Sequence, residues 1–170
     1  LTLGAKNLNA FVGLNGPASA ASAMGLSLTG VEFGLALFKA AAGQGSDDVS
    51  WTALKASASG FSVTGIPEVT IAGATLSIAI NTVSGLAAEF DADQKVVDFA
   101  AAPLTVQTGA TTSLDINFAG NDGQLLEAAG NLTLSVGRFF YVSGDLALRK
   151  ALATVTLADE SEVLTDLLTL

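Results

Sequence analysis

Large apolar residues alternate with small or polar residues along most of this chain, with a period of two. The alternation is clearest in four runs: 31–37, 76–80, 114–118 and 132–136. Successive side chains of a β-strand point to opposite faces of a sheet, so each run predicts a strand with one apolar face and one small or polar face. Strands of this kind are typical of antiparallel sheets, and we predict an all-β fold.

Breaks rich in Gly, Asn and Asp separate the predicted strands. We expect strands over 2–13, 24–41, 50–64, 68–82, 95–108, 112–119, 125–137, 138–149, 151–158 and 162–170. The last run also fits one face of a helix, but a strand is favoured because its neighbours are strands. We predict a single domain, residues 1–170, in which long antiparallel hairpins form an elongated two-layer sandwich or flattened tube. The small faces of the strands would let a second layer approach closely.

Composition excludes several classes of chemistry. The 170 residues include no Cys and no His, which removes disulfides, the usual zinc, copper and iron ligands, and the Ser-His-Asp and Cys-His arrangements of nucleophilic enzymes. We therefore expect no enzyme. The net charge is −9 and the seven Lys and Arg residues are scattered, so nucleic acid is not an expected partner. No apolar run is long enough to predict a transmembrane helix.

Acidic turns are the one candidate for a metal site. Asp91 and Asp93 lie in one predicted turn, and Asn121 and Asp122 lie in another. Hard oxygen ligands suit calcium, and the chain offers no softer ligand set, so calcium is the expected ion if any binds. A single turn with two such residues would need a second turn or a neighbouring subunit to complete the shell. The alternative is that these turns are simply solvated.

Three consecutive aromatic residues, Phe139, Phe140 and Tyr141, would place rings on both faces of a strand. We interpret them as core residues, and one of the two faces should then meet a second layer or a neighbouring molecule.

Several runs resemble the long tandem repeats of giant bacterial surface proteins, which often carry an LEPR-XLL signature that this sequence lacks. The resemblance is carried by 8–13, 34–39, 54–60 and 140–147. It implies an extracellular, elongated β array in an adhesin, matrix or filament, and it brings no catalytic residues. The chain starts Leu1-Thr2-Leu3 and ends Leu168-Thr169-Leu170, which leads us to expect one unit of a larger tandem array.

Two functions follow from these patterns. The first is a structural repeat of an extracellular filament, matrix or adhesin protein that contacts its own neighbours through sheet edges or tandem links. The low share of charged residues, 14%, suits a surface that neighbouring units cover. The second is a β-groove module that binds or transfers lipid. A closed, dry pair of sheets would favour the first function, and an open trough lined by Leu and Phe would favour the second.

Overall fold

The computed structural model describes residues 1–41, 48–86 and 95–170. It confirms the all-β, antiparallel fold: ten strands and one short 3₁₀ helix make up its regular elements. The elements in chain order are β1 (Thr2–Leu14), β2 (Met24–Lys39), β3 (Ser50–Ala58), β4 (Gly60–Thr64), β5 (Val69–Ser84), β6 (Leu104–Gln107), β7 (Ser113–Ile116), η2 (Gly120–Asp122), β8 (Leu125–Val136), β9 (Phe140–Thr156) and β10 (Glu162–Thr169).

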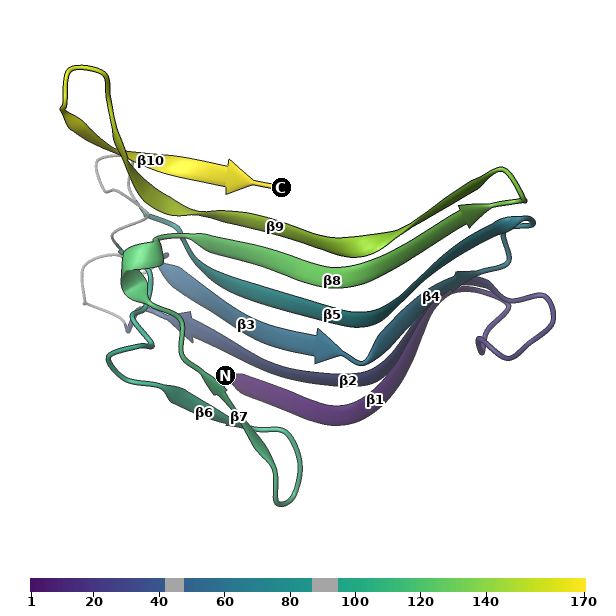
Figure 1. The fold of residues 1–170 in the computed structure, drawn as a ribbon. Coiled ribbons are helices and arrows are strands. Elements are labelled where there is room, and N and C mark those ends of the chain that lie inside the picture. Colours follow the sequence, from purple (N-terminus) through teal and green to yellow (C-terminus); the bar gives the residue numbers. More distant parts are fainter. Residues whose placement is uncertain (42–47, 87–94) are drawn as a thin grey trace.

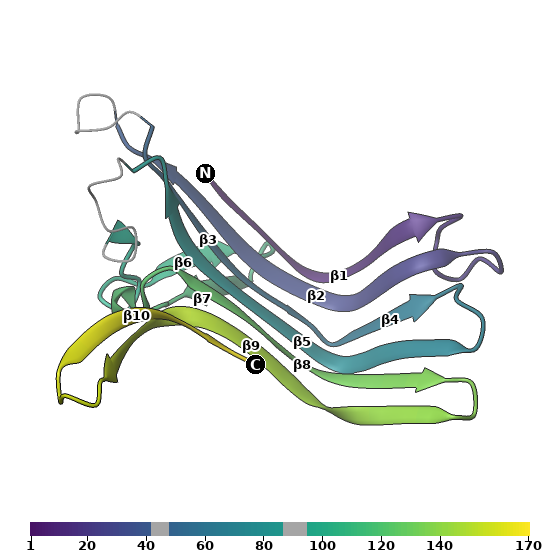
Figure 2. The same cartoon turned by 90° about the horizontal axis from the view of Figure 1, so that it is seen from above.

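One eight-stranded sheet contains all strands except β6 and β7. Its order is β1-β2-β3-β5-β8-β9-β10, and β4 continues the row of β3 between β2 and β5. The strands are long, their axes are closely aligned, and they bend near their middle (Figures 1 and 2).

The bend coincides with irregular positions that lie beside one another in neighbouring strands. Asn7 in β1 and Gly30 in β2 have positive φ values of 58°, and the register between these strands shifts at the same place. Ser59 separates β3 from β4, and its backbone N–H donates to the Thr29 carbonyl. The β5–β8 register shifts between Ala72 and Thr75. Bulges of this kind bend a strand without ending its pairing, so the sheet continues through the bend.

A second layer covers part of one face of the sheet. It consists of residues 95–124, which we call the covering segment, and it contains the two-stranded sheet β6–β7 and η2. The segment lies against β1, β2 and β3 at the end of the sheet where the chain begins (Figures 1 and 2). The second layer is thus one short hairpin with its flanks, smaller than the full second sheet of the predicted sandwich.

Small residues beneath the covering segment let it approach closely. Ala36 and Ala53 are buried under Phe99, Val106 and Ile116, and these five residues form the core. A Cβ added to Gly34 would lie 3.2 Å from Cβ of Val106, which leaves little room for any larger residue. The expectation that small faces admit a second layer is confirmed here.

Most predicted strands are present, but three boundaries are wrong. The predicted break at residue 150 does not exist, because β9 runs from Phe140 to Thr156. The run 95–108 forms a strand only over Leu104–Gln107, and 50–64 is divided at Ser59. The strand expected over 162–170 is confirmed as β10.

Candidate interaction surface

The register of the large sheet assigns every strand residue to one of two faces, since residues paired across an antiparallel ladder lie on the same face. The face opposite the covering segment carries rows of large apolar residues, and we call it the open face. Two rows across the strands define it. One row is Leu3, Leu35, Leu54, Ile80 and Leu126, and the other is Val12, Leu26, Val63, Ile71, Leu134 and Val142.

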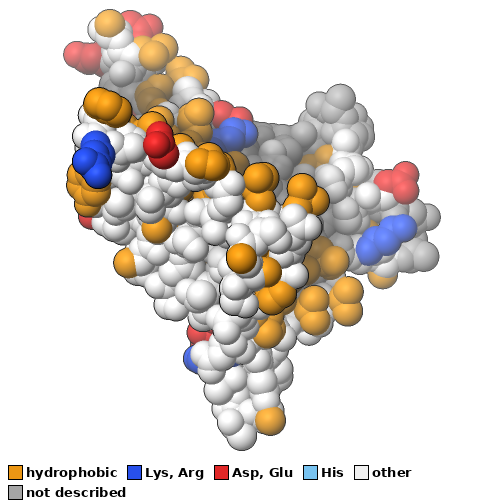
Figure 3. Space-filling model, turned by 90° about the vertical axis from the view of Figure 1, so that its right-hand side faces the viewer, with side chains coloured by type: hydrophobic (Ala, Val, Ile, Leu, Met, Phe, Trp, Pro, Cys, Tyr) orange, Lys and Arg blue, Asp and Glu red, His pale blue; other side chains and the backbone are white. Residues whose placement is uncertain are grey.

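No described element packs on the open face, so its side chains remain partly in solvent. Leu26 is 37% exposed and Leu126 is 40% exposed, although both lie on inner strands. Exposure is greater on the edge strands, reaching 70% at Val12 of β1 and 55% at Leu146 of β9. Figure 3, which views the molecule from the end of the sheet beyond the bend, shows hydrophobic side chains at the surface and few charged ones.

Charged side chains on the open face are confined to one half of the sheet. They are Lys39, Lys150, Glu162 and Asp166, all in the half that carries the covering segment on its other side. Lys150 Nζ and a carboxylate oxygen of Asp166 form an ion pair 2.8 Å long. Beyond the bend, the strand residues of the open face include no charged residue. That half is an uninterrupted apolar surface.

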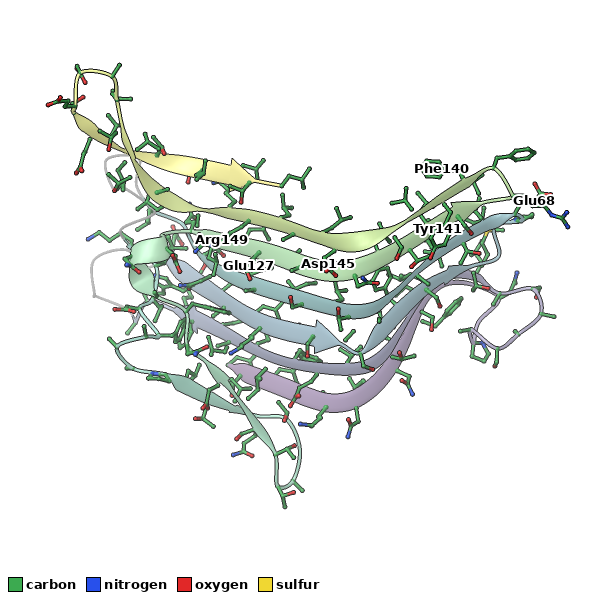
Figure 4. All side chains as sticks on the ribbon, viewed as in Figure 1. Glu68, Glu127, Phe140, Tyr141, Asp145 and Arg149 are labelled. Atoms are coloured by element: carbon green, nitrogen blue, oxygen red, sulfur yellow. The ribbon has the colours of Figure 1, made fainter. Side chains whose placement is uncertain are left out.

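The other face, which the covering segment partly occupies, holds most of the polar interactions. Arg149 lies between Asp122 and Glu127, with N···O distances of 2.8 and 3.3 Å, and Glu127 and Arg149 are neighbours in Figure 4. Lys55 Nζ donates to the Asp115 carbonyl and to Oδ1 of Asn117. These contacts attach the covering segment to the sheet.

The same face is polar beyond the bend. Ser62 and Thr70 are exposed there, and the hydroxyls of Thr133 and Ser143 lie 3.1 Å apart. The two faces of the sheet therefore differ sharply in chemistry over this half.

An apolar hollow of about 400 Å³ lies on the open face near the bend. Its large lining residues are Phe61, Leu76, Leu132, Leu146, Leu148 and Leu170. The bulge in β5 places Gly73 beside Phe61, where any Cβ would overlap the ring, so glycine is needed for the ring to lie along the sheet. A hollow with this lining can accept an aliphatic group and offers it no charged partner.

Asp98 organises the covering segment through its carboxylate. Oδ1 accepts the backbone N–H groups of Gly120, Ala100 and Ala101. These hydrogen bonds favour the charged carboxylate, so the pKa of Asp98 is lowered from its ordinary value. The hydrogen bond from Gly120 is the largest cause.

The predicted calcium ligands are only partly within the described residues. Asp91 and Asp93 lie outside them. Asn121 is exposed within η2, and Oδ1 of Asp122 accepts a hydrogen bond from Nη2 of Arg149 at 2.8 Å. Among the described residues, no group of three or more His, Cys, Asp or Glu side chains is placed to share a metal ion. Calcium binding at these turns stays a prediction, which a chelator titration of thermal stability would test.

The three consecutive aromatic residues are not core residues, so that interpretation was wrong. Phe139 is in the turn between β8 and β9 and is 98% exposed. Phe140 and Tyr141 begin β9 and lie on opposite faces of it, and both are exposed (Figure 4). Period-two alternation could assign these residues to faces, but it could not show that neither face is covered at this end of the sheet.

Comparisons with protein-family models, with curated proteins and with solved structures found no match to this chain. Within the described ranges, no helix has the length and apolar character required to cross a membrane.

Proposed function

We propose that this chain is a structural module of an extracellular filament, matrix or adhesin, and that its copies assemble with the open face buried between them. The observation that carries the proposal is the open face itself, whose apolar rows no described residue covers. Contiguous apolar patches larger than a few hundred Å² are rare on monomeric proteins and mark interaction sites.

The size of the open face suits a permanent interface. With strands about 4.8 Å apart and about 3.3 Å per residue, the face measures roughly 30 Å by 45 Å. Two copies placed face to face would bury roughly 2,700 Å² in total, within the range of obligate interfaces, about 2,000 to 5,000 Å². Such interfaces are also the most hydrophobic class, as this face is.

A second copy is a suitable occupant for chemical reasons as well. The face beyond the bend has no charge of its own, so it offers nothing to recognise a charged partner. Two copies would match apolar to apolar without leaving an unpaired charge at the centre. The extracellular location is part of the proposal, and it rests on the resemblance of the strand runs to bacterial surface repeats.

The test is the mass of the protein in solution, measured by sedimentation velocity. Leu26→Lys combined with Leu126→Lys places two charges on the open face. The matched control, Ser62→Lys with Thr70→Lys, adds the same charge at exposed positions of the opposite face. We expect the parent chain and the control to associate and the open-face variant to sediment as a monomer with unchanged strand content by circular dichroism. A parent chain that is monomeric at all concentrations, or an open-face variant that associates like the control, would refute the proposal.

The open face is an uncovered apolar surface with a hollow lined by Leu and Phe, which is the feature expected of the second function, so the binding of a lipid chain is a second candidate. In that case the open face would hold acyl chains instead of another copy. An extract of the purified protein in organic solvent, examined by mass spectrometry, would then contain a stoichiometric amphiphile, and the loaded protein would be monomeric. Leu146→Lys places a charge in the wall of the hollow, so the extract of this variant should no longer contain the amphiphile.

A further inference from the structure

The two halves of the sheet differ in charge. Beyond the bend, the segments 8–29, 60–74 and 131–144 contain only two charged residues, Glu68 and Arg138, which have opposite signs. The net charge of −9 therefore belongs entirely to the rest of the chain. The half beyond the bend ends in turns, and we call this end of the molecule the tip.

Three turns lie side by side at the tip, and they cover residues 15–23, 65–68 and 137–139. The N–H of Gly137 donates to the Glu68 carbonyl at 2.6 Å, which joins the second turn to the third. Gly65 has a φ of 86°, and a Cβ there would overlap Met24 at the start of β2. Glycine therefore lets the first two turns touch, and the tip is one continuous surface.

Apolar side chains are exposed at the tip. They lie on the turns or on the strand ends beside them: Leu14, Met24, Ile66, Phe139 and Phe140. Phe139 is almost completely exposed, so its ring adds nothing to the core. Figure 3 looks onto this end of the molecule, and Figure 4 labels Phe140 and Tyr141 there. Large exposed apolar groups gathered in one place mark an interaction site.

The two charged residues of the tip lie in neighbouring turns. Both are exposed, and a Cβ added to Gly137 would lie 3.9 Å from Oε2 of Glu68. No described residue forms an ion pair with Arg138. A guanidinium binds phosphate oxygens, and a carboxylate attracts an ammonium group. The head group of a zwitterionic phospholipid carries a phosphate and an ammonium group, so its charges complement those of the tip.

A lipid bilayer supplies both environments that the tip requires. Its acyl chains take up aliphatic and aromatic side chains, and its interfacial layer suits rings with a polar group, such as Tyr141. A dry protein interface would have to bury Glu68 and Arg138, whereas a bilayer surface leaves both in contact with head groups and water. The charges of the other half stay in water at the far end of the sheet.

We propose that the tip docks on a phospholipid bilayer, with Phe139 inserted among the acyl chains. This goes beyond the proposed function, because it gives the module a partner other than its own copies. Burial of the open face uses residues of the strands and leaves the three turns uncovered, so the two contacts are compatible.

Flotation with vesicles of phosphatidylcholine tests the proposal, because vesicles carry bound protein upward in a density gradient while protein aggregates sink. We expect the parent chain to float with the vesicles. Phe139→Ser should bind at least about tenfold more weakly, as expected for the loss of one buried aromatic side chain. The matched control is Leu157→Ser, an exposed apolar residue in the turn between β9 and β10, which should bind like the parent.

A fluorescence measurement locates the contact. Phe139→Trp and Leu157→Trp each add one indole to the single Trp51 of the parent chain. Vesicles of phosphatidylcholine brominated on its acyl chains quench only an indole that reaches those chains. We expect the added fluorescence of Phe139→Trp to be quenched and that of Leu157→Trp to be unchanged.

A parent chain that does not float, a Phe139→Ser variant that floats like the parent, or equal quenching at the two positions would overturn the proposal. Normal flotation of Phe139→Ser together with loss of flotation in the Leu26→Lys, Leu126→Lys variant would assign the lipid contact to the open face instead. The proposed function has a separate test, because sedimentation without vesicles reports burial of the open face whether or not the tip binds lipid.

Discussion

The Asp98 carboxylate joins two parts of the covering segment, since it accepts N–H groups from Gly120 and from the turn at Ala100 and Ala101. Its pKa is lowered in the folded chain, so its contribution to stability is present above its unfolded pKa, about 4, and is lost as pH falls through the folded pKa. We expect the parent chain to lose more stability than Asp98→Asn when the pH is lowered from neutral to below 4. Denaturant midpoints at the two pH values measure this, and an equal loss in both proteins would contradict it.

Single residues also show the limit of sequence reasoning. Alternation in the run 114–118 assigned Phe118 to an apolar face, and Phe118 packs against the core. The same reasoning treated Phe139, Phe140 and Tyr141 as core, and they are exposed. The pattern tells which side chains share a face, but whether anything covers that face depends on contacts between segments far apart in the chain.

At the level of elements, the covering segment is held by a few buried side chains. Ile116 of β7 is fully buried against Ala36 and Ala53 of the sheet. Trp51 on β3, the only Trp of the chain, donates its indole N–H to the Lys95 carbonyl at 2.7 Å. The fluorescence of Trp51 therefore reports whether the start of the covering segment is in place.

We expect Ile116→Ala to destabilise the protein by about 2–5 kcal/mol, because the cavity it leaves lies between two layers that cannot close around it. Chemical denaturation followed by Trp51 fluorescence measures the loss. Leu114→Ala, at a half-buried position of the same strand, is the control and should cost less. A loss from Ile116→Ala no larger than that of the control would show that the core is not centred on Ile116.

The strands themselves were predictable where alternation was regular and turn residues were present, as for β2 and β8. The break predicted at residue 150 had no Gly, Pro or Asn to support it, and β9 continues there. The strand predicted over 95–108 forms only at Leu104–Gln107, because Asp98 draws the preceding residues into a turn. The sequence could identify the residues of the open face on each side of the bend as alternating positions. It could not show that these residues stay on one face through the bend, because that depends on the register shifts at Asn7, Gly30 and Gly73.

For the whole molecule, burial of the open face predicts a thermodynamic signature of association. Hydrophobic association weakens on cooling and strengthens with sulfate salts, whereas association through surface ion pairs weakens as ionic strength rises. We expect the associated fraction to increase on warming from near freezing to room temperature and on adding ammonium sulfate. Sedimentation across these conditions measures it, and dissociation by moderate salt would point to the ion pairs instead. The net charge of −9 adds a repulsion that any salt would screen in favour of assembly.

The covering segment leaves the sheet after β5 and returns to it at β8, two strands that are themselves neighbours. Each strand of the large sheet consequently lies next to the strands that precede and follow it in the chain, when β3 and β4 are counted as one strand position. In this order the hairpins β1–β2, β8–β9 and β9–β10 form between strands that are adjacent in the chain, whereas β8 finds β5 only after the whole covering segment has been made. The rows from β1 to β5 can therefore pair one strand at a time while the rest of the chain is still being made.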